Sequence, residues 1–216
     1  MIQFFHVSKT YDRQPAIKDV SFRVKKGEFV YLTGPSGAGK STIMRLMLCA
    51  DEPDEGQILI NGRNIARLKQ KDIPQLRRGM GIIFQDSRLI ERKTVYENVA
   101  LPLRIMGASE DSVRKKTTAI LKSIGIYNKK DKYPLQLSGG EQQRTAIARA
   151  LVKEPLILLA DEPTGNLDWE MSQYIMDLMK DIHAQGTTII FATHDMELIK
   201  TMPKRVIEIE AGRVKE

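Results

Sequence analysis

Apolar and polar residues follow one another along this chain with two different periods. Short runs with the alternation or the apolar content of a strand occur at several places, namely residues 2–7, 19–24, 29–32, 57–60, 82–84, 156–160, 188–192 and 205–209. Helical spacing covers much of 94–151 and returns between the strands at 156–160 and 188–192. Strands that alternate with helices predict an α/β fold with a mainly parallel sheet covered on both faces. The helical block in the middle predicts an inserted subdomain.

Length and composition indicate a folded domain. The chain has 216 residues, of which 42% are hydrophobic and 28% charged, and these values exclude a disordered or fibrous protein. Its apolar runs are far shorter than the ~20 residues that cross a bilayer, and residues 1–13 lack the features of a secretory signal. The lone cysteine, Cys49, lies in an apolar run, so we expect it to be buried and the protein to be cytosolic.

The net charge of +7 is spread unevenly over two basic stretches. In 63–78 the basic residues are Arg63, Arg67, Lys69, Lys71, Arg77 and Arg78, and the acidic residue is Asp72. In 114–132 the basic residues are Arg114, Lys115, Lys116, Lys122, Lys129, Lys130 and Lys132, and the acidic residue is Asp131. Each stretch is either an ordinary solvated surface or a surface that meets lipid head groups or nucleic acid. Composition alone does not distinguish these alternatives.

A glycine-rich segment joins the strand at 29–32 to a helix whose apolar positions fill 43–48. It fits the pattern G-x-x-x-x-G-K-[ST] with Gly34, Pro35, Ser36, Gly37, Ala38, Gly39, Lys40, Ser41 and Thr42. Glycines let successive backbone N–H groups converge on phosphate oxygens beside a helix N-terminus. Lys40 adds a charge for the β- and γ-phosphates, and the Ser41 hydroxyl suits Mg²⁺. The alternative, a plain flexible turn, is disfavoured by the strand and helix on either side.

Two acidic residues follow the buried strand at 156–160. Asp161, at the strand end, is placed to hold a metal ion beside the phosphate loop. Glu162, one residue further, is placed to act as a general base or to polarise water. An ordinary acidic exit from a strand is the alternative, and the neighbouring phosphate loop makes it the weaker one.

A third motif, Leu137 to Gln143, opens a helix predicted over 142–151. Ser138 and Glu141 have the spacing of a capping box, which is a sufficient structural explanation by itself. The same Ser-Gly-Gly also exposes backbone N–H groups at a helix N-terminus, where an anion would bind. Two phosphate-type sites about a hundred residues apart are most simply explained if the second meets a nucleotide bound by another copy of the chain.

The ordered set of motifs resembles the ATP-binding subunits of ABC transporters over essentially the whole chain. Besides the phosphate loop, it comprises Gln85 of the Q-loop, the signature Ser138, Gly139, Gly140, Glu141 and Gln142, the Walker B pair Asp161 and Glu162, the D-loop Gly165, Asn166, Leu167 and Asp168, and the switch residue His194. The resemblance implies a P-loop NTPase (RecA-like) core, an N-terminal antiparallel β subdomain and an inserted α-helical subdomain. It also implies a head-to-tail homodimer in which two ATP molecules lie between one copy's phosphate loop and the other's signature.

Residue roles follow from the same resemblance. Tyr11 would stack on adenine, although an ordinary half-exposed tyrosine at a strand end is the alternative. We expect Lys40, Glu162 and His194 to be catalytic, and Ser41, Gln85 and Asp161 to hold Mg²⁺. The remaining expected contacts to ATP are 34–42, Gln85, the signature 138–142 and Asp168. His6 and His183 match no motif. One ATPase domain is expected over 1–216, with the nucleotide-binding core in 1–86 and 155–216 and the helical signature subdomain in about 87–154.

Finer strings point to one branch of the family. The segments 34–42, 65–78, 83–87, 94–103 and 160–168 look most like the bacterial cell-division ATPases, which pair with an integral membrane protein of the FtsX type. Several of these strings are shared with the motors of lipoprotein-release and macrolide-type exporters, which remain the alternative. We expect a peripheral ATPase on the cytoplasmic face of the plasma (inner) membrane that couples ATP hydrolysis to cell-wall remodelling. No nucleic-acid partner is expected.

Overall fold

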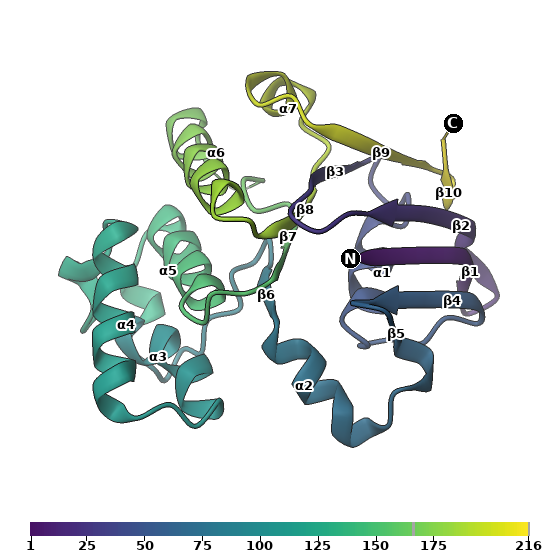
Figure 1. Cartoon of the computed structure of the whole chain (residues 1–216). Helices are drawn as coiled ribbons and strands as arrows, with labels where there is room; N and C mark the ends of the chain where they lie inside the picture. The colour runs from purple at the N-terminus through teal and green to yellow at the C-terminus, as the bar shows by residue number, and fades with distance from the viewer. Residues whose placement is uncertain (166, 216) are drawn as a thin grey trace.

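An antiparallel sheet near the N-terminus forms one side of the molecule (Figure 1). The structure is a computed structural model that describes residues 1–165 and 167–215. Its strands β1 (Ile2–Tyr11) and β2 (Gln14–Val24) form a hairpin, and β4 (Glu55–Ile60) and β5 (Arg63–Asn64) extend it in the order β2-β1-β4-β5. Buried apolar residues recur every two to four positions in β1 and β2 and cover one face of these strands. The expected antiparallel β subdomain is therefore present.

A second, mainly parallel sheet forms the centre of the molecule. Its strand order is β10-β9-β3-β8-β7-β6, with β10 (Arg213–Val214), β9 (Arg205–Glu210), β3 (Phe29–Thr33), β8 (Thr188–Ala192), β7 (Ile157–Asp161) and β6 (Met80–Ile83). All neighbouring pairs from β9 to β6 are parallel, and β10 runs antiparallel to β9. The predicted mainly parallel sheet is confirmed.

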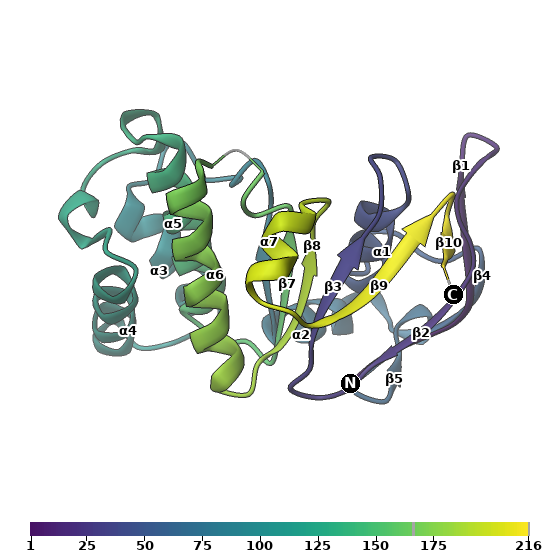
Figure 2. The ribbon, with the colours of Figure 1, turned by 90° about the horizontal axis from the view of Figure 1, so that it is seen from above.

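Both faces of the parallel sheet are covered, which explains why its strands are apolar runs rather than alternating ones. Phe29 and Tyr31 of β3 pack into one core with the helical block, and Val30 and Leu32 pack into another with α1 (Lys40–Met47) and the antiparallel sheet. Figure 2 shows this layering from above. The helical block comprises α3 (Val95–Ile105), α4 (Glu110–Ser123) and α5 (Gly139–Leu151), and α6 (Trp169–Ala184), which lies between β7 and β8 in the chain, packs into the same core.

Side chains cap each of these four helices at its N-terminus. Thr94 and Ser138 form capping boxes with the glutamate three residues on, and Ser109 and Asp168 accept hydrogen bonds from the first turns of α4 and α6. Helix α5 therefore begins at Gly139, three residues before the predicted start.

Some local features differ from the sequence-based expectations. The short helices α2 (Ile73–Arg78) and α7 (Met196–Thr201) were not predicted. Cys49 is only half-buried and has a positive φ of 52°, because it lies in the turn after α1 rather than inside the helix. Among the described residues, no helix combines the length and apolarity needed to cross a membrane.

Candidate active site

Three of the predicted motifs meet at one edge of the parallel sheet. Strands β3, β8 and β7 are parallel neighbours, and the register pairs Leu32 with Ala192 and Ala192 with Asp161. Their carboxyl ends therefore lie side by side, and the chain leaves them through the phosphate loop 34–39, through Glu162 and through His194. Ligands of open α/β sheets bind at such an edge.

The phosphate loop is wedged between the two sheets. Gly34 has a φ of 139°, and a Cβ added to it would lie 2.1 Å from the carbonyl oxygen of Ile209 in β9. Gly39, with a φ of 111°, would bring a Cβ within 2.6 Å of Ile17 Cγ2 in β2. Only glycine fits at either position. The loop ends at Lys40, the first residue of α1, so backbone N–H groups of the loop and helix start are available to an anion.

Lys40 is held inside this loop. Its side chain is buried, and its Nζ donates hydrogen bonds to the carbonyl oxygens of Gly34 at 2.6 Å and Pro35 at 3.0 Å. The same Nζ lies 3.8 Å from Oε1 of Glu162. The ammonium charge is thus fixed between the phosphate loop and the end of β7.

Glu162 links Lys40 to His194. Its Oε1 lies 3.1 Å from Nδ1 of His194, whose side chain is 64% exposed. The φ of Glu162 is 44°, a left-handed conformation that a residue other than glycine adopts at a cost of about 1–3 kcal/mol and that is common at functional sites. The predicted catalytic residues Lys40, Glu162 and His194 therefore lie together.

The predicted metal ligands also converge here. Burial raises the pKa of Asp161, and a hydrogen bond from the Ser41 hydroxyl acts in the opposite direction. The exposed Gln85 lies near Glu162, because a Cβ on Gly165 would lie 3.2 Å from Gln85 Nε2 and 3.6 Å from Glu162 Oε2. A hydroxyl, a carboxylate and an amide are the hard oxygen donors that suit Mg²⁺, so these residues fit such an ion.

Tyr11 lies at the end of β1 with its ring partly exposed. Its hydroxyl donates a hydrogen bond to Asp51, and Arg45 of α1 binds the same carboxylate with both Nε, at 2.6 Å, and Nη2, at 3.0 Å. Arg45 lowers the pKa of Asp51 to about 2. The ring is therefore tethered to the helix that follows the phosphate loop, and Lys9 Nζ lies over it, 5.6 Å from the ring centroid.

The signature residues lie away from the phosphate loop. Helix α5 packs into the core on one face of the parallel sheet and α1 into the core on the other. Ser138 caps α5, and Gly139 faces open space. The carboxylate of Glu141 accepts a hydrogen bond from the backbone N–H of Ser138 and forms an ion pair with Lys129. The side chain of Gln142 donates to the carbonyl oxygen of Pro134. Asp168 caps α6, and Asn166 of the predicted D-loop lies outside the described residues. One copy alone does not bring the signature to the phosphate loop.

Two side chains that had no predicted role connect α5 to this edge of the sheet. Gln143 is 4% exposed, and its Nε2 donates to the carbonyl oxygens of Pro163 at 2.9 Å and Phe84 at 3.4 Å. Arg149 donates to the carbonyl oxygens of Ser87 and Arg88, both at 2.6 Å, and these two Q-loop residues have positive φ values. A glutamine on the inward, otherwise apolar face of α5 was the available signal for Gln143.

Comparisons with known proteins match this geometry. The family model described as ABC transporter matches residues 17–165. The chain belongs to the ABC transporter ATPase family. It is 47% identical over 216 residues to the cell division ATP-binding protein FtsE of Mycobacterium tuberculosis, covering 99% of this chain and 94% of that protein. It is 46% identical over 215 residues to FtsE of Escherichia coli K12, covering 99% and 97%.

Comparison with a solved structure also identifies the fold of this chain as that of an ABC ATPase. The ATP-binding cassette MJ0796, in a dimeric post-hydrolysis state bound to ADP and Pi, superposes with a TM-score of 0.93 at 37% identity, covering 100% of this chain and 97% of that one. The predicted P-loop NTPase fold and the prediction of an ATP-hydrolysing enzyme are confirmed.

Tyr11 can be tested directly in this ABC ATPase. Tyr11→Ala removes the aromatic face, and we expect ATP to bind about 5- to 150-fold more weakly, as for the loss of one base–aromatic stack worth ~1–3 kcal/mol. Tyr11→Phe keeps the ring and loses only the hydrogen bond to Asp51, so its affinity should stay close to that of the parent. Titration with ATP and with inorganic triphosphate distinguishes a lost contact to adenine from a lost contact to the phosphates. Equal losses for both ligands in Tyr11→Ala would exclude adenine stacking.

Proposed function

We propose that this ABC ATPase acts in bacterial cell division, as the FtsE partner of an integral membrane protein of the FtsX type. The observation that carries the proposal is the 46–47% identity to FtsE proteins over 99% of the chain. The chain would lie on the cytoplasmic face of the plasma membrane, held there by its partner. Hydrolysis of ATP would then be coupled to remodelling of the cell wall.

The proposed chemistry uses Lys40, Glu162 and His194, which lie together where the chain leaves β3, β7 and β8. Lys40, freed from the carbonyls of Gly34 and Pro35, neutralises charge on the β- and γ-phosphates together with the backbone N–H groups of the loop. Glu162 orients the attacking water and accepts its proton. His194 fixes the Glu162 carboxylate through the contact between Nδ1 and Oε1 and faces the γ-phosphate.

Mg²⁺ is the proposed metal, and Ser41, Asp161 and Gln85 are the residues that would hold it. When bound with ATP, the ion would supply positive charge that offsets the negative charge developing on the phosphates during hydrolysis. The buried Asp161, whose pKa is raised, supplies the carboxylate, and Ser41 is exposed at the start of α1.

The proposed active assembly is a head-to-tail homodimer. Its support in this chain is the open N-terminus of α5 at Gly139, which has no phosphate loop beside it in one copy. A partner's bound nucleotide would meet Ser138, Gly139 and Gly140. Exposed Trp169 and Met196 border a hollow of about 510 Å³ next to Glu162 and His194, which is a suitable surface for the second copy.

The same proposal divides the chain into a nucleotide-binding core, 1–86 and 155–216, and a helical part, about 87–154. The membrane partner would dock near the Q-loop. Of the apolar residues near the Q-loop, Val99 and Leu103 are buried in the helical core, whereas Ile90 is exposed. Only the exposed members remain candidates.

Capture from native membranes tests the proposed function. The tagged chain, solubilised with its complexes in mild detergent, should carry a single type of membrane subunit, of the FtsX class, identified by mass spectrometry. The Ile90→Glu variant should recover less of it while keeping its ATPase activity in solution. Recovery of a lipoprotein-release or macrolide-export subunit instead would contradict the cell-division role and favour the exporter alternative.

A further inference from the structure

The two basic stretches differ in how their charges are paired. In 114–132 the structure pairs basic side chains with carboxylates, at distances of 2.6–3.3 Å, in the pairs Arg114–Asp111, Lys116–Glu154, Lys129–Glu141 and Lys130–Asp131. Much of the positive charge of that stretch is therefore compensated within the protein. It has the properties of an ordinary solvated surface.

The stretch 63–78 has no such compensation. All six of its basic side chains are exposed, and across residues 1–165 and 167–215 none of them forms an ion pair with a carboxylate. Arg77 donates to the carbonyl oxygens of Leu48 and Cys49, and Arg78 to the side chain of Gln75. Asp72, the acidic residue of the stretch, is half-buried. The positive charges thus project together toward solvent.

Apolar side chains hold this stretch in place from beneath. Ile65 is buried, and Leu68 and Leu76 pack against the core that contains α1 and the antiparallel sheet. The basic residues between them turn outward, so the segment has one anchored apolar side and one charged side. Since the apolar side is already covered by the protein, the outer side can act only through its charge.

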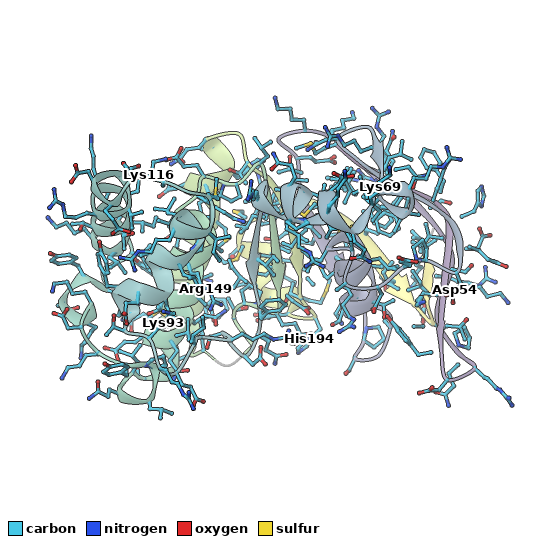
Figure 3. The ribbon with its side chains drawn as sticks, turned by 90° about the horizontal axis from the view of Figure 1, so that it is seen from below. Asp54, Lys69, Lys93, Lys116, Arg149 and His194 are labelled. Carbon is cyan, nitrogen blue, oxygen red and sulfur yellow. The ribbon has the colours of Figure 1, made fainter. Side chains whose placement is uncertain are left out.

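The stretch 63–78 lies beside a hollow near the Q-loop. Lys153 donates from its Nζ to the carbonyl oxygen of Arg77 at 2.9 Å, and it also lines a hollow of about 350 Å³ together with Ile90, Pro102 and Arg149. Figure 1 shows α2 and α3 along the same lower edge of the molecule, and Figure 3 looks onto that side, with Lys69 near α2 and Lys116 at the opposite end on α4. The charged surface is therefore continuous with the region proposed to face the membrane partner.

We propose that the exposed basic residues of 63–78 bind anionic lipid head groups directly, as a second contact between this chain and the bilayer. Anionic membranes attract exposed lysine and arginine side chains within about a Debye length. Nucleic acid is disfavoured because the stretch has no aromatic residue for base stacking and α2 has only six residues. The choice of a lipid surface rests on the proposed function, which places the chain at a membrane.

Co-sedimentation of the purified full chain with vesicles tests the proposal without any membrane protein. The chain should bind vesicles of phosphatidylglycerol mixed with phosphatidylcholine, not vesicles of phosphatidylcholine alone, and binding should fall as NaCl rises from about 0.05 to 0.5 M. The patch variant replaces Arg67, Lys69 and Lys71 with Gln. Each lost charge should weaken binding about fivefold, and the triple change roughly 100-fold.

A matched control removes the same net charge from the other stretch by replacing Arg114, Lys115 and Lys122 with Gln. It should bind vesicles nearly as well as the parent, and both variants should keep the parent's ATPase rate in solution. Equal losses in the two variants, or no binding of the parent to anionic vesicles, would overturn the proposal. So would tight binding to duplex DNA that the patch variant alone loses. None of these outcomes affects the capture experiment, because the vesicles contain no partner protein.

Discussion

Replacing Glu162 with Gln will leave ATP binding intact and slow turnover by about 10²–10⁴-fold, the usual contribution of a positioned general base. Glutamine keeps the shape of the side chain beside Lys40 and His194 but accepts no proton from water. ATP that is bound and not hydrolysed should hold two copies together. Size-exclusion chromatography with and without Mg-ATP, together with phosphate release, measures both effects.

Glu110→Gln is the matched control for this experiment. Glu110 is exposed at the start of α4, forms an ion pair with Arg104 and does not border the hollow beside Glu162, so the substitution should leave hydrolysis unchanged. If Glu162→Gln stays monomeric in ATP, or hydrolyses at the parent's rate, the role proposed for Glu162 is wrong.

Lys40→Ala should weaken ATP binding by about 1.5–3 kcal/mol, or roughly 10- to 150-fold, the range for a hydrogen bond to a charged group. The lysine also donates to two carbonyls of the phosphate loop, so part of any loss could come from a loosened loop. Lys40→Arg restores the charge with a different shape, and thermal unfolding without nucleotide reports on the loop. Unchanged ATP affinity in Lys40→Ala would mean that 34–42 is only a turn.

Much of the fold could be predicted because its signals are local. The strands of the parallel sheet are short apolar runs, and the glycine-rich loop between β3 and α1 identifies the edge at which a ligand binds. The capping residues at Thr94 and Ser138 mark helix starts in the sequence. His194 could be grouped with Glu162 in advance only through the family resemblance, since 32 residues separate the two.

The features that were missed depend on contacts between distant parts of the chain. Gln143 reaches Phe84 across 59 residues and Arg149 reaches Ser87 across 62, and no local pattern carries that information. Helix α2 is short and rich in basic residues, so its few apolar positions gave no readable period. Ion pairing of the two basic stretches likewise became visible only when acidic residues such as Glu154 and Glu141 were placed in space.

The wedged position of the phosphate loop affects how mutants of it can be interpreted. A methyl group at Gly34 or Gly39 would collide with β9 or with β2, whether or not nucleotide is present. An inactive Gly39→Ala protein is therefore expected to be a folding mutant first, with the junction between its two sheets damaged. Its failure to support growth would say little about phosphate binding. Genetic screens that score only loss of activity will count these glycines as catalytic, although much of the constraint on them is architectural.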